Sequence, residues 1–129
     1  MGVLKKIILV AQENAEARKG LLHALEPLYS EGYIILTCMT GEEVIAKLAL
    51  GSPSLIILDL SLPELNGFQV ISKLKSNPDT QTIPITVLIP PIQGIFGFMV
   101  RNLDVTYIVN RPAPPKKILQ VAKNCLESN

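Results

Sequence analysis

Residues 54–67 read SLIILDLSLPELNG, and this stretch decides the fold that the sequence predicts. Four apolar residues, Leu55 to Leu58, lead without a polar break into Asp59. An apolar run of this length between two prolines is typical of a buried parallel strand. The strand carries a carboxylate at its carboxyl end, the edge of an open α/β sheet where ligands bind. Residues 62–67 have the composition of a turn, which leaves room above the carboxylate.

The rest of the chain alternates strand and helix patterns around this segment. Apolar runs predict strands at residues 6–10, 33–39, 55–59, 85–89 and 106–109. Helical spacing and capping residues predict helices at 15–26, 41–50 and 68–77 and a last helix from 114–115 onward. The remaining helical segment is residues 92–103, which follows Pro90-Pro91 and is interrupted by glycines at 94 and 97. Since parallel crossovers are right-handed, the helices should cover both faces of the sheet, giving a doubly wound α/β fold.

Composition narrows the function classes. The chain has 129 residues, which suits one domain spanning 1–129, and its net charge of +1 provides no basic field for nucleic acid. No apolar run approaches the roughly 20 residues of a membrane span, and no small-residue cleavage site follows the first strand. Cys38 and Cys125 are too far apart in sequence for a metal motif and are expected to be buried thiols. We therefore expect a cytoplasmic domain that binds neither nucleic acid nor membrane.

Several short matches, in order along essentially the whole chain, carry a resemblance. They are KIILV at 6–10, GEE at 41–43, LDLSLP at 58–63 with Asn66-Gly67, Ile83-Pro84 and Arg111-Pro112. With these matches the chain resembles the receiver domains of two-component response regulators, which are CheY-like. The resemblance implies a flavodoxin-like fold with five parallel strands in the order 2-1-3-4-5 and five flanking helices. It also implies phosphoryl transfer from a sensor histidine kinase to Asp59, the position of the phosphoacceptor.

The magnesium site that the resemblance implies is depleted in this sequence. Receivers usually carry two adjacent acids after the first strand, but Ala11 and Gln12 occupy these positions. Mg²⁺ is bound through carboxylates, carbonyls and water, so the remaining donors of Asp59 and the backbone near Ser61 make a poor site. Glu13 lies one residue too late and would need a shift of the loop. We expect Mg²⁺ binding to be weak or absent.

Two further positions depart from the family pattern. Ile89 stands where receivers place a Ser or Thr whose hydroxyl bonds the phosphoryl group, and isoleucine has no such donor. Arg111 matches the family lysine that pairs with phosphoryl oxygens, and it presents a planar fork in place of an ammonium. In the family the peptide bond before the matching proline is cis. The aromatic switch position falls on Ile108, with Tyr107 beside it.

Three function classes follow from these residues. The first is a receiver phosphorylated at Asp59 in phosphorelay signalling. The second is a pseudo-receiver, in which Asp59 forms a salt bridge with Arg111 and the domain serves as a protein interaction or dimerisation module. The third, an enzyme or cofactor binder on this fold, is disfavoured. The loop after the first strand lacks the hydroxyls and glycine that cradle a flavin phosphate, and Ser61 replaces the second carboxylate of aspartate-nucleophile phosphatases.

An apolar segment at Ile92 to Val100 is a candidate partner surface. Six of its nine residues are apolar, too many for one face of a surface helix. The segment either folds into the core or presents an exposed patch of Ile95, Phe96, Phe98 and Met99. In the second case, it would support self-association together with the last helix, or binding of a histidine kinase or other signalling protein.

Overall fold

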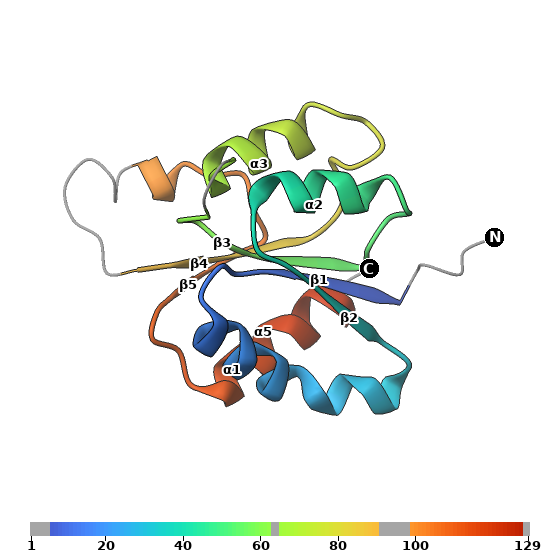
Figure 1. Ribbon diagram of the computed structural model, residues 1–129, viewed down its shortest axis with the longest axis vertical. Coiled ribbons are helices and arrows are strands. Elements are labelled where there is room, and N and C mark those ends of the chain that lie inside the picture. Colours follow the sequence, from blue (N-terminus) through green and yellow to red (C-terminus); the bar gives the residue numbers. More distant parts are fainter. Residues whose placement is uncertain (1–5, 63–64, 91–98, 128–129) are drawn as a thin grey trace.

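The computed structural model describes residues 6–62, 65–90 and 99–127, and its centre is a parallel five-stranded sheet (Figure 1). The strands are β1 (Ile7–Ala11), β2 (Ile34–Cys38), β3 (Leu55–Asp59), β4 (Ile85–Ile89) and β5 (Tyr107–Asn110). Their order across the sheet is β2-β1-β3-β4-β5. This is the flavodoxin-like order that the resemblance implied. It places β3, and therefore Asp59, at the centre of the sheet.

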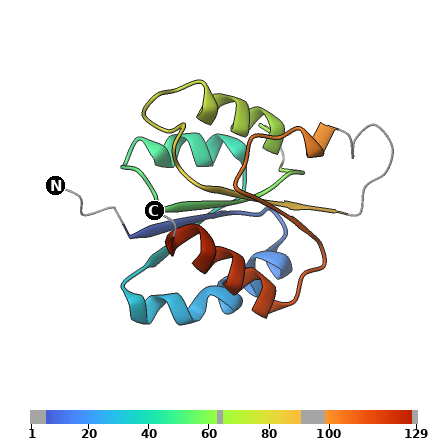
Figure 2. The ribbon, with the colours of Figure 1, turned by 180° about the vertical axis from the view of Figure 1, so that it is seen from behind.

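Helices cover both faces of the sheet. They are α1 (Ala15–Leu25), α2 (Gly41–Leu48), α3 (Gly67–Lys75) and α5 (Pro115–Glu127), with the 3-10 helix η1 (Glu26–Glu31) after α1. Figures 1 and 2 show α2 and α3 on one face and α1 and α5 side by side on the other. The helical segment predicted near 92–103 is described only at its end, where residues 99–101 are helical.

The apolar core consists of two clusters, one on each side of the sheet. Because alternate residues of a strand face opposite sides, Leu9 and Leu58 pack toward α2 and α3, whereas Ile8 and Ile57 pack toward α1 and α5. All residues of β1, β3 and β4 are buried. This explains why these strands are continuous apolar runs, as the sequence predicted.

The ends of the elements agree closely with the prediction and differ at one proline. The strands β3 and β4 have the predicted limits, whereas β1 and β5 are shifted by one residue. Pro27 does not simply end α1, because it occupies the first turn of η1. A 3-10 helix accepts proline there, since the first amides of a helix have no partner within it.

Local contacts fix the start of α2. The Thr40 hydroxyl accepts from the Glu43 amide at 3.1 Å, and the Glu43 carboxylate accepts from the amide of Met39. The Thr40 half of the predicted capping box is therefore formed, whereas Glu43 bonds the amide of the residue before the N-cap in place of the Thr40 amide. A Cβ on Gly41 would lie 1.8 Å from the Leu65 carbonyl oxygen, so this close approach to the loop before α3 requires glycine.

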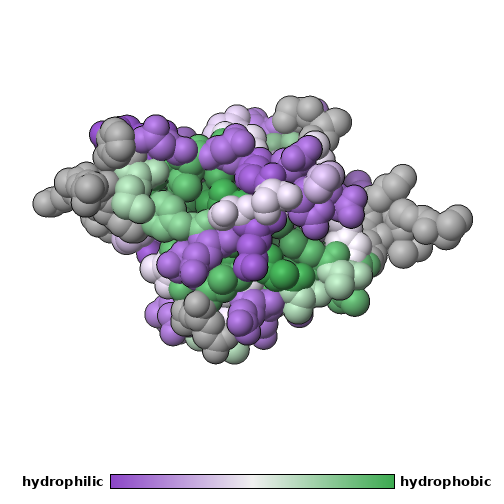
Figure 3. All heavy atoms as spheres, turned by 90° about the horizontal axis from the view of Figure 1, so that it is seen from above, coloured by the Kyte–Doolittle hydropathy of each residue, from purple (hydrophilic) through white to green (hydrophobic). Residues whose placement is uncertain are grey.

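The outer surface mixes polar and apolar groups. Figure 3, seen from the side of α2 and α3, shows bands of polar residues with apolar residues between them. Among the described residues, no helix is long and apolar enough to span a bilayer. Cys38 and Cys125 are buried and neither is in a disulfide, as predicted. Burial raises the pKa of the Cys38 thiol from 9.0 to about 11 and also raises that of Cys125.

Candidate functional site

Asp59 lies at the carboxyl end of the central strand, with a side chain that is almost fully buried. Its residue exposure is 2%. The strands β1 and β4 pair with β3 on either side, so the loops after β1, β3 and β4 begin at the same edge of the sheet. A carboxylate in such a place has to be compensated by hydrogen bonds or a cation, because water reaches it poorly.

Four donors surround the Asp59 carboxylate. Its Oδ1 accepts from the Ser61 amide at 2.8 Å and from the Ser61 hydroxyl at 2.7 Å. Its Oδ2 accepts from Gln12 Nε2 at 2.6 Å and lies 3.4 Å from Arg111 Nη2. Both oxygens therefore have two partners each. The salt bridge with Arg111, one of the two readings of Asp59 from the sequence, is present.

Gln12 is oriented by the backbone around it. It follows β1, its exposure is 3%, and its backbone amide donates to the Cys38 carbonyl. Its Oε1 accepts from the Asn14 amide at 2.9 Å, which leaves Nε2 facing Asp59. The side chain at this position is thus a hydrogen-bond donor toward Asp59, where the resemblance implies an acid.

Arg111 approaches Asp59 from the end of β5. Its backbone amide donates to the Ile89 carbonyl at 2.7 Å, which continues the pairing of β4 and β5. The Arg111-Pro112 peptide bond is cis, as the resemblance implied. Arg111 Nε is buried and has no hydrogen-bond partner among the described residues. The guanidinium therefore uses one side on Asp59 and keeps another donor unused.

The donors around Asp59 do not fit Mg²⁺. Gln12 Nε2 and Arg111 Nη2 direct hydrogens at Oδ2, whereas a metal needs lone pairs at that place. Glu13 is exposed, and Arg18 holds its backbone carbonyl and that of Gln12 at 3.1 and 3.0 Å. Within the described part of the chain, no group of three or more His, Cys, Asp or Glu residues could hold a metal ion.

The remaining predicted positions make no hydrogen bond or ion pair with the Asp59 side chain among the described residues. Ala11 ends β1 and is fully buried, and Ile89 ends β4 with 4% exposure, and both pack in the core beneath α2 and α3. Tyr107 and Ile108, the candidates for the aromatic switch position, are 37% and 38% exposed on the edge strand β5.

Most of the apolar segment at 92–100 lies outside the described residues. Ile95, Phe96 and Phe98 belong to that part, so both readings of the segment stand as predictions for them. At its end, Met99 is 46% exposed and Val100 is buried at 3%. Of the two described residues, Met99 is therefore exposed and Val100 belongs to the core.

Sequence reasoning missed two contacts of the site. Gln12 was read as a lost acid, whereas its amide is a direct partner of Asp59. A signal was available, because a glutamine at the end of a strand beside a central aspartate has a donor to offer it. Arg18, which holds the loop after β1, carried no signal beyond its place in the second turn of α1.

Comparisons with known proteins agree with the fold. The model of the response regulator receiver domain matches residues 8–123. The chain is 31% identical over 118 residues to the probable transcriptional regulator ycf27 of Cyanophora paradoxa, covering 92% of this chain and 47% of that protein. It is 37% identical over 86 residues to the response regulator PleD of Caulobacter vibrioides, covering 67% of this chain and 18% of PleD.

A solved structure gives the same result. The receiver domain of a signal transduction histidine kinase from Syntrophus aciditrophicus aligns with a TM-score of 0.86 at 25% identity, covering 95% of this chain and 91% of that one. The chain spans about half or less of the two curated relatives named above. From the family match, the strand order and the aspartate at the end of β3, we conclude that this chain belongs to the response regulator receiver domains of two-component signalling.

Proposed function

We propose that this receiver domain acts as a phosphorylation-independent interaction module, a pseudo-receiver, in two-component signalling. The observation that carries the proposal is the pair of donors on Asp59 Oδ2. The Gln12 amide lies at 2.6 Å and the Arg111 guanidinium at 3.4 Å. In this arrangement Asp59 is a structural carboxylate that joins the ends of β1, β3 and β5.

The occupied lone pairs make Asp59 a poor nucleophile. To accept a phosphoryl group, a carboxylate oxygen must direct a lone pair at phosphorus. Both oxygens of Asp59 already accept two interactions each. Attack would give up at least one hydrogen bond to a charged group, which costs about 1.5–3 kcal/mol.

The charge around Asp59 also disfavours phosphoryl transfer. The transferred group spreads negative charge over three oxygens, which cations have to neutralise. Within the described residues, Arg111 is the cation at ion-pair distance from Asp59, and that carboxylate already uses its charge. Ile89 provides no hydroxyl to hold the product. The domain therefore has the fold of a receiver, and we expect Asp59 to stay unphosphorylated.

The partner of such a module is another signalling protein, such as a sensor histidine kinase, or a second copy. Tyr107 and Ile108 on β5 are 37% and 38% exposed, and Met99, in the segment between β4 and β5, is 46% exposed. An edge strand with apolar side chains is a ready contact surface. We propose this surface, together with α5, for protein contacts. The net charge of +1 offers no comparable basis for binding nucleic acid.

A titration with Mg²⁺ and beryllofluoride, a mimic of the acyl phosphate, tests the proposal. Amide NMR spectra of the wild type should not change when Mg²⁺ and the mimic are added in excess, and the spectra of Asp59→Ala should be equally unresponsive to the same additions. A receiver that carries both acidic residues after its first strand serves as the positive control. Saturable shifts of the amides around Asp59 and Arg111 that vanish in Asp59→Ala would overturn the proposal and show a working phosphoacceptor.

A variant that restores the acid tests whether the Gln12 amide is what prevents the response to Mg²⁺. Gln12→Asp replaces the donor on Oδ2 with an acid at the position where receivers have one. We expect this variant to gain a measurable response to Mg²⁺, because a second carboxylate then faces Asp59. Gln12→Ala, which removes the amide and adds no charge, is the matched control. An equal response of both variants would contradict the role given to the amide.

A further inference from the structure

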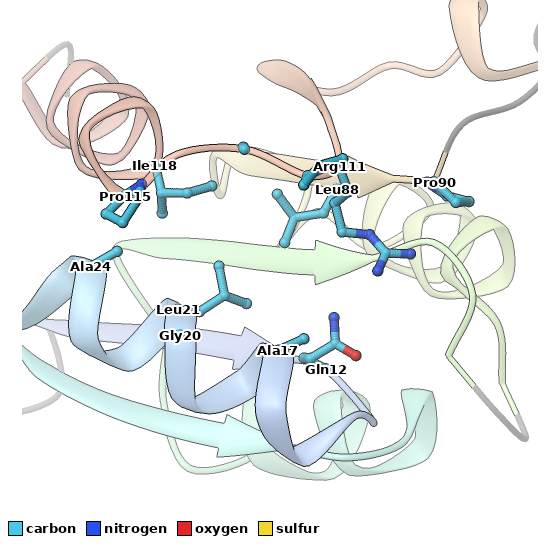
Figure 4. Close-up of a pocket in the computed structure, with 12 residues that line it drawn as sticks. Gln12, Ala17, Gly20, Leu21, Ala24, Leu88, Pro90, Arg111, Pro115 and Ile118 are labelled. Atoms are coloured by element: carbon cyan, nitrogen blue, oxygen red, sulfur yellow. The ribbon is translucent and has the colours of Figure 1, made fainter.

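A cavity of about 460 Å³ lies between α1 and α5 and shares Gln12 and Arg111 with the site around Asp59. The function proposed above does not use this cavity. This volume is within the range of pockets that hold small molecules. Figure 4 shows Gln12 and Arg111 together at one end, and Ala24, Pro115 and Ile118 at the other. The cavity is therefore polar at one end and aliphatic along the rest of its length.

The space exists because α1 presents small residues to it. Ala17, Gly20 and Ala24 line the cavity at helical spacing, and a Cβ built on Gly20 would have no atom within 4 Å. Gly20 is exposed, so the cavity opens to solvent there. From the walls, Leu21 of α1 and Ile118 of α5 point toward each other across the cavity (Figure 4). A hydrocarbon chain or ring would contact aliphatic groups on both sides.

The polar end lacks an acceptor. Arg111 Nε is buried and has no hydrogen-bond partner among the described residues, and buried donors of folded proteins almost always have one. The nearby side-chain acceptors are already engaged, because Asp59 serves four donors and Gln12 Oε1 accepts from Asn14. Arg111 Nε itself is closed to solvent, so an acceptor oxygen from outside the chain would reach it only after a small movement of the side chain, which as a whole is 31% exposed.

From these observations we propose that the cavity binds a small aliphatic or aromatic carboxylic acid. Its carboxylate accepts from Arg111, and its hydrocarbon part lies between α1 and α5. A planar guanidinium matches a carboxylate in shape and charge. A monoanion fits better than a phosphate dianion, because the Asp59 carboxylate lies 3.4 Å from the same guanidinium and would repel a second full charge. The proposal does not depend on whether Asp59 accepts a phosphoryl group.

Binding would couple the cavity to the site through one side chain. Arg111 contacts Asp59 on one side and would contact the ligand on the other. A bound acid that draws the guanidinium toward itself would lengthen the contact with Asp59 and so bias the end of β5, the strand that carries Tyr107 and Ile108.

Titration of the wild type with octanoate, followed by amide NMR, is the first test. We expect saturable shifts that begin at Gly20, Leu21, Ala113, Ile118 and the Arg111 side chain. 1-Octanol and methyl octanoate have the same chain without the charge and should bind at least about tenfold more weakly, because the guanidinium then meets a neutral acceptor in place of a carboxylate. 4-Phenylbutyrate, an aromatic acid, tests the same cavity with a different shape.

Two substitutions at one position locate the ligand. Gly20→Leu places a side chain in the cavity and should weaken octanoate binding by about tenfold or more, as added bulk does in an apolar pocket. Gly20→Ala adds one methyl group and should bind within a few fold of the wild type. Melting curves of both variants show whether each is folded. Arg111→Gln should reduce the preference for octanoate over 1-octanol, and this comparison does not depend on the Gly20 variants.

Four results would overturn the proposal. The first is the absence of saturable shifts with either acid. The second is equal binding of octanoate by Gly20→Leu and Gly20→Ala, which would place the ligand elsewhere. The third is equal binding of octanoate and 1-octanol by the wild type, which would refute the carboxylate class. The fourth is broadening of α1 and α5 resonances with protein concentration alone, which would show that a second copy covers the cavity.

Discussion

The Asp59 carboxylate is compensated by a neutral amide and a guanidinium. Removing its charge should therefore change stability in the opposite direction from removing a charge in an acidic cluster. Where several carboxylates share a site, removing one charge relieves repulsion and stabilises the fold. Here Oδ2 faces two donors, Gln12 Nε2 and Arg111 Nη2. Removing the charge should therefore destabilise the fold.

Asp59→Asn provides the measurement. One side of the carboxylate would become an NH₂ group that either faces the donors of Gln12 and Arg111 or those of Ser61. We expect a loss of about 1–3 kcal/mol in the free energy of unfolding by urea denaturation. Asp79→Asn, at an exposed aspartate, is the control and should change stability by less than about 0.5 kcal/mol. An increase in stability of Asp59→Asn would mean that carboxylate repulsion dominates the site.

Cys38 gives the fold a dependence on alkaline pH. Its pKa is about 11 in the fold and 9.0 in the reference state, because burial disfavours the thiolate. Between these values the unfolded chain holds fewer protons than the folded chain, so stability falls as the pH rises. We expect this one group to remove about 2 kcal/mol by pH 11, with no effect below pH 8.

Cys38→Ala isolates this contribution. Tyrosines and lysines also titrate at high pH, so the informative quantity is the difference between wild type and variant at each pH. Denaturant unfolding should show this difference changing between pH 9 and pH 11 in favour of the variant. A difference that stays constant over that range would show that the folded chain does not hold the thiol neutral.

At the scale of elements, two glycines in helices predict opposite effects. Gly41→Ala would place a Cβ 1.8 Å from the Leu65 carbonyl oxygen, and we expect a loss of about 3 kcal/mol in stability. Gly20→Ala meets no atom within 4 Å and should gain about 0.5–1 kcal/mol, because alanine favours the helix. Thermal unfolding of both variants checks the pair. Equal effects at the two positions would refute the close approach at Gly41.

The elements could be predicted because their signals are local. The apolar run before Asp59 and the run between Pro84 and Pro90 gave β3 and β4 with their observed limits. The prediction was less accurate at Pro27, because proline suits the first turn of a 3-10 helix as well as it suits a helix end. The capping box of Asn66 and Gln69 at α3 was also not predicted from the sequence, although both residue types fit it.

The position of the site and the salt bridge between Asp59 and Arg111 could be predicted, whereas its hydrogen bonds could not. Asp59 was expected at the edge of the sheet because strand ends meet there. The hydrogen bond from Gln12 depends on the register of β1 against β3 and on the Asn14 amide that orients the side chain. The cavity beside Arg111 depends on the packing of α1 against α5. Such long-range geometry leaves no local pattern in the sequence.

In the whole molecule, β2 and β5 are the two edge strands of the sheet, and we expect any self-association to occur at β5. Sedimentation of the wild type should show reversible self-association at high concentration if a second copy is the partner at β5. Ile108→Glu, on β5, should abolish it by placing a charge in the contact. Ile34→Glu is the matched control, because Ile34 is 57% exposed on the opposite edge strand, β2. A monomeric wild type at all concentrations would refute self-association.

The hydrogen bond between Gln12 and Asp59 joins residues 47 positions apart. Closing so long a loop costs chain entropy before the contact stabilises anything, so it should form after the folding transition state. Losing a late contact hastens unfolding and leaves the folding rate almost unchanged. We therefore expect Gln12→Ala to leave the folding rate almost unchanged and to raise the unfolding rate, which shortens the lifetime of the native state. The hydrogen bond between Gln12 and Asp59 would then help to set how long the domain stays folded.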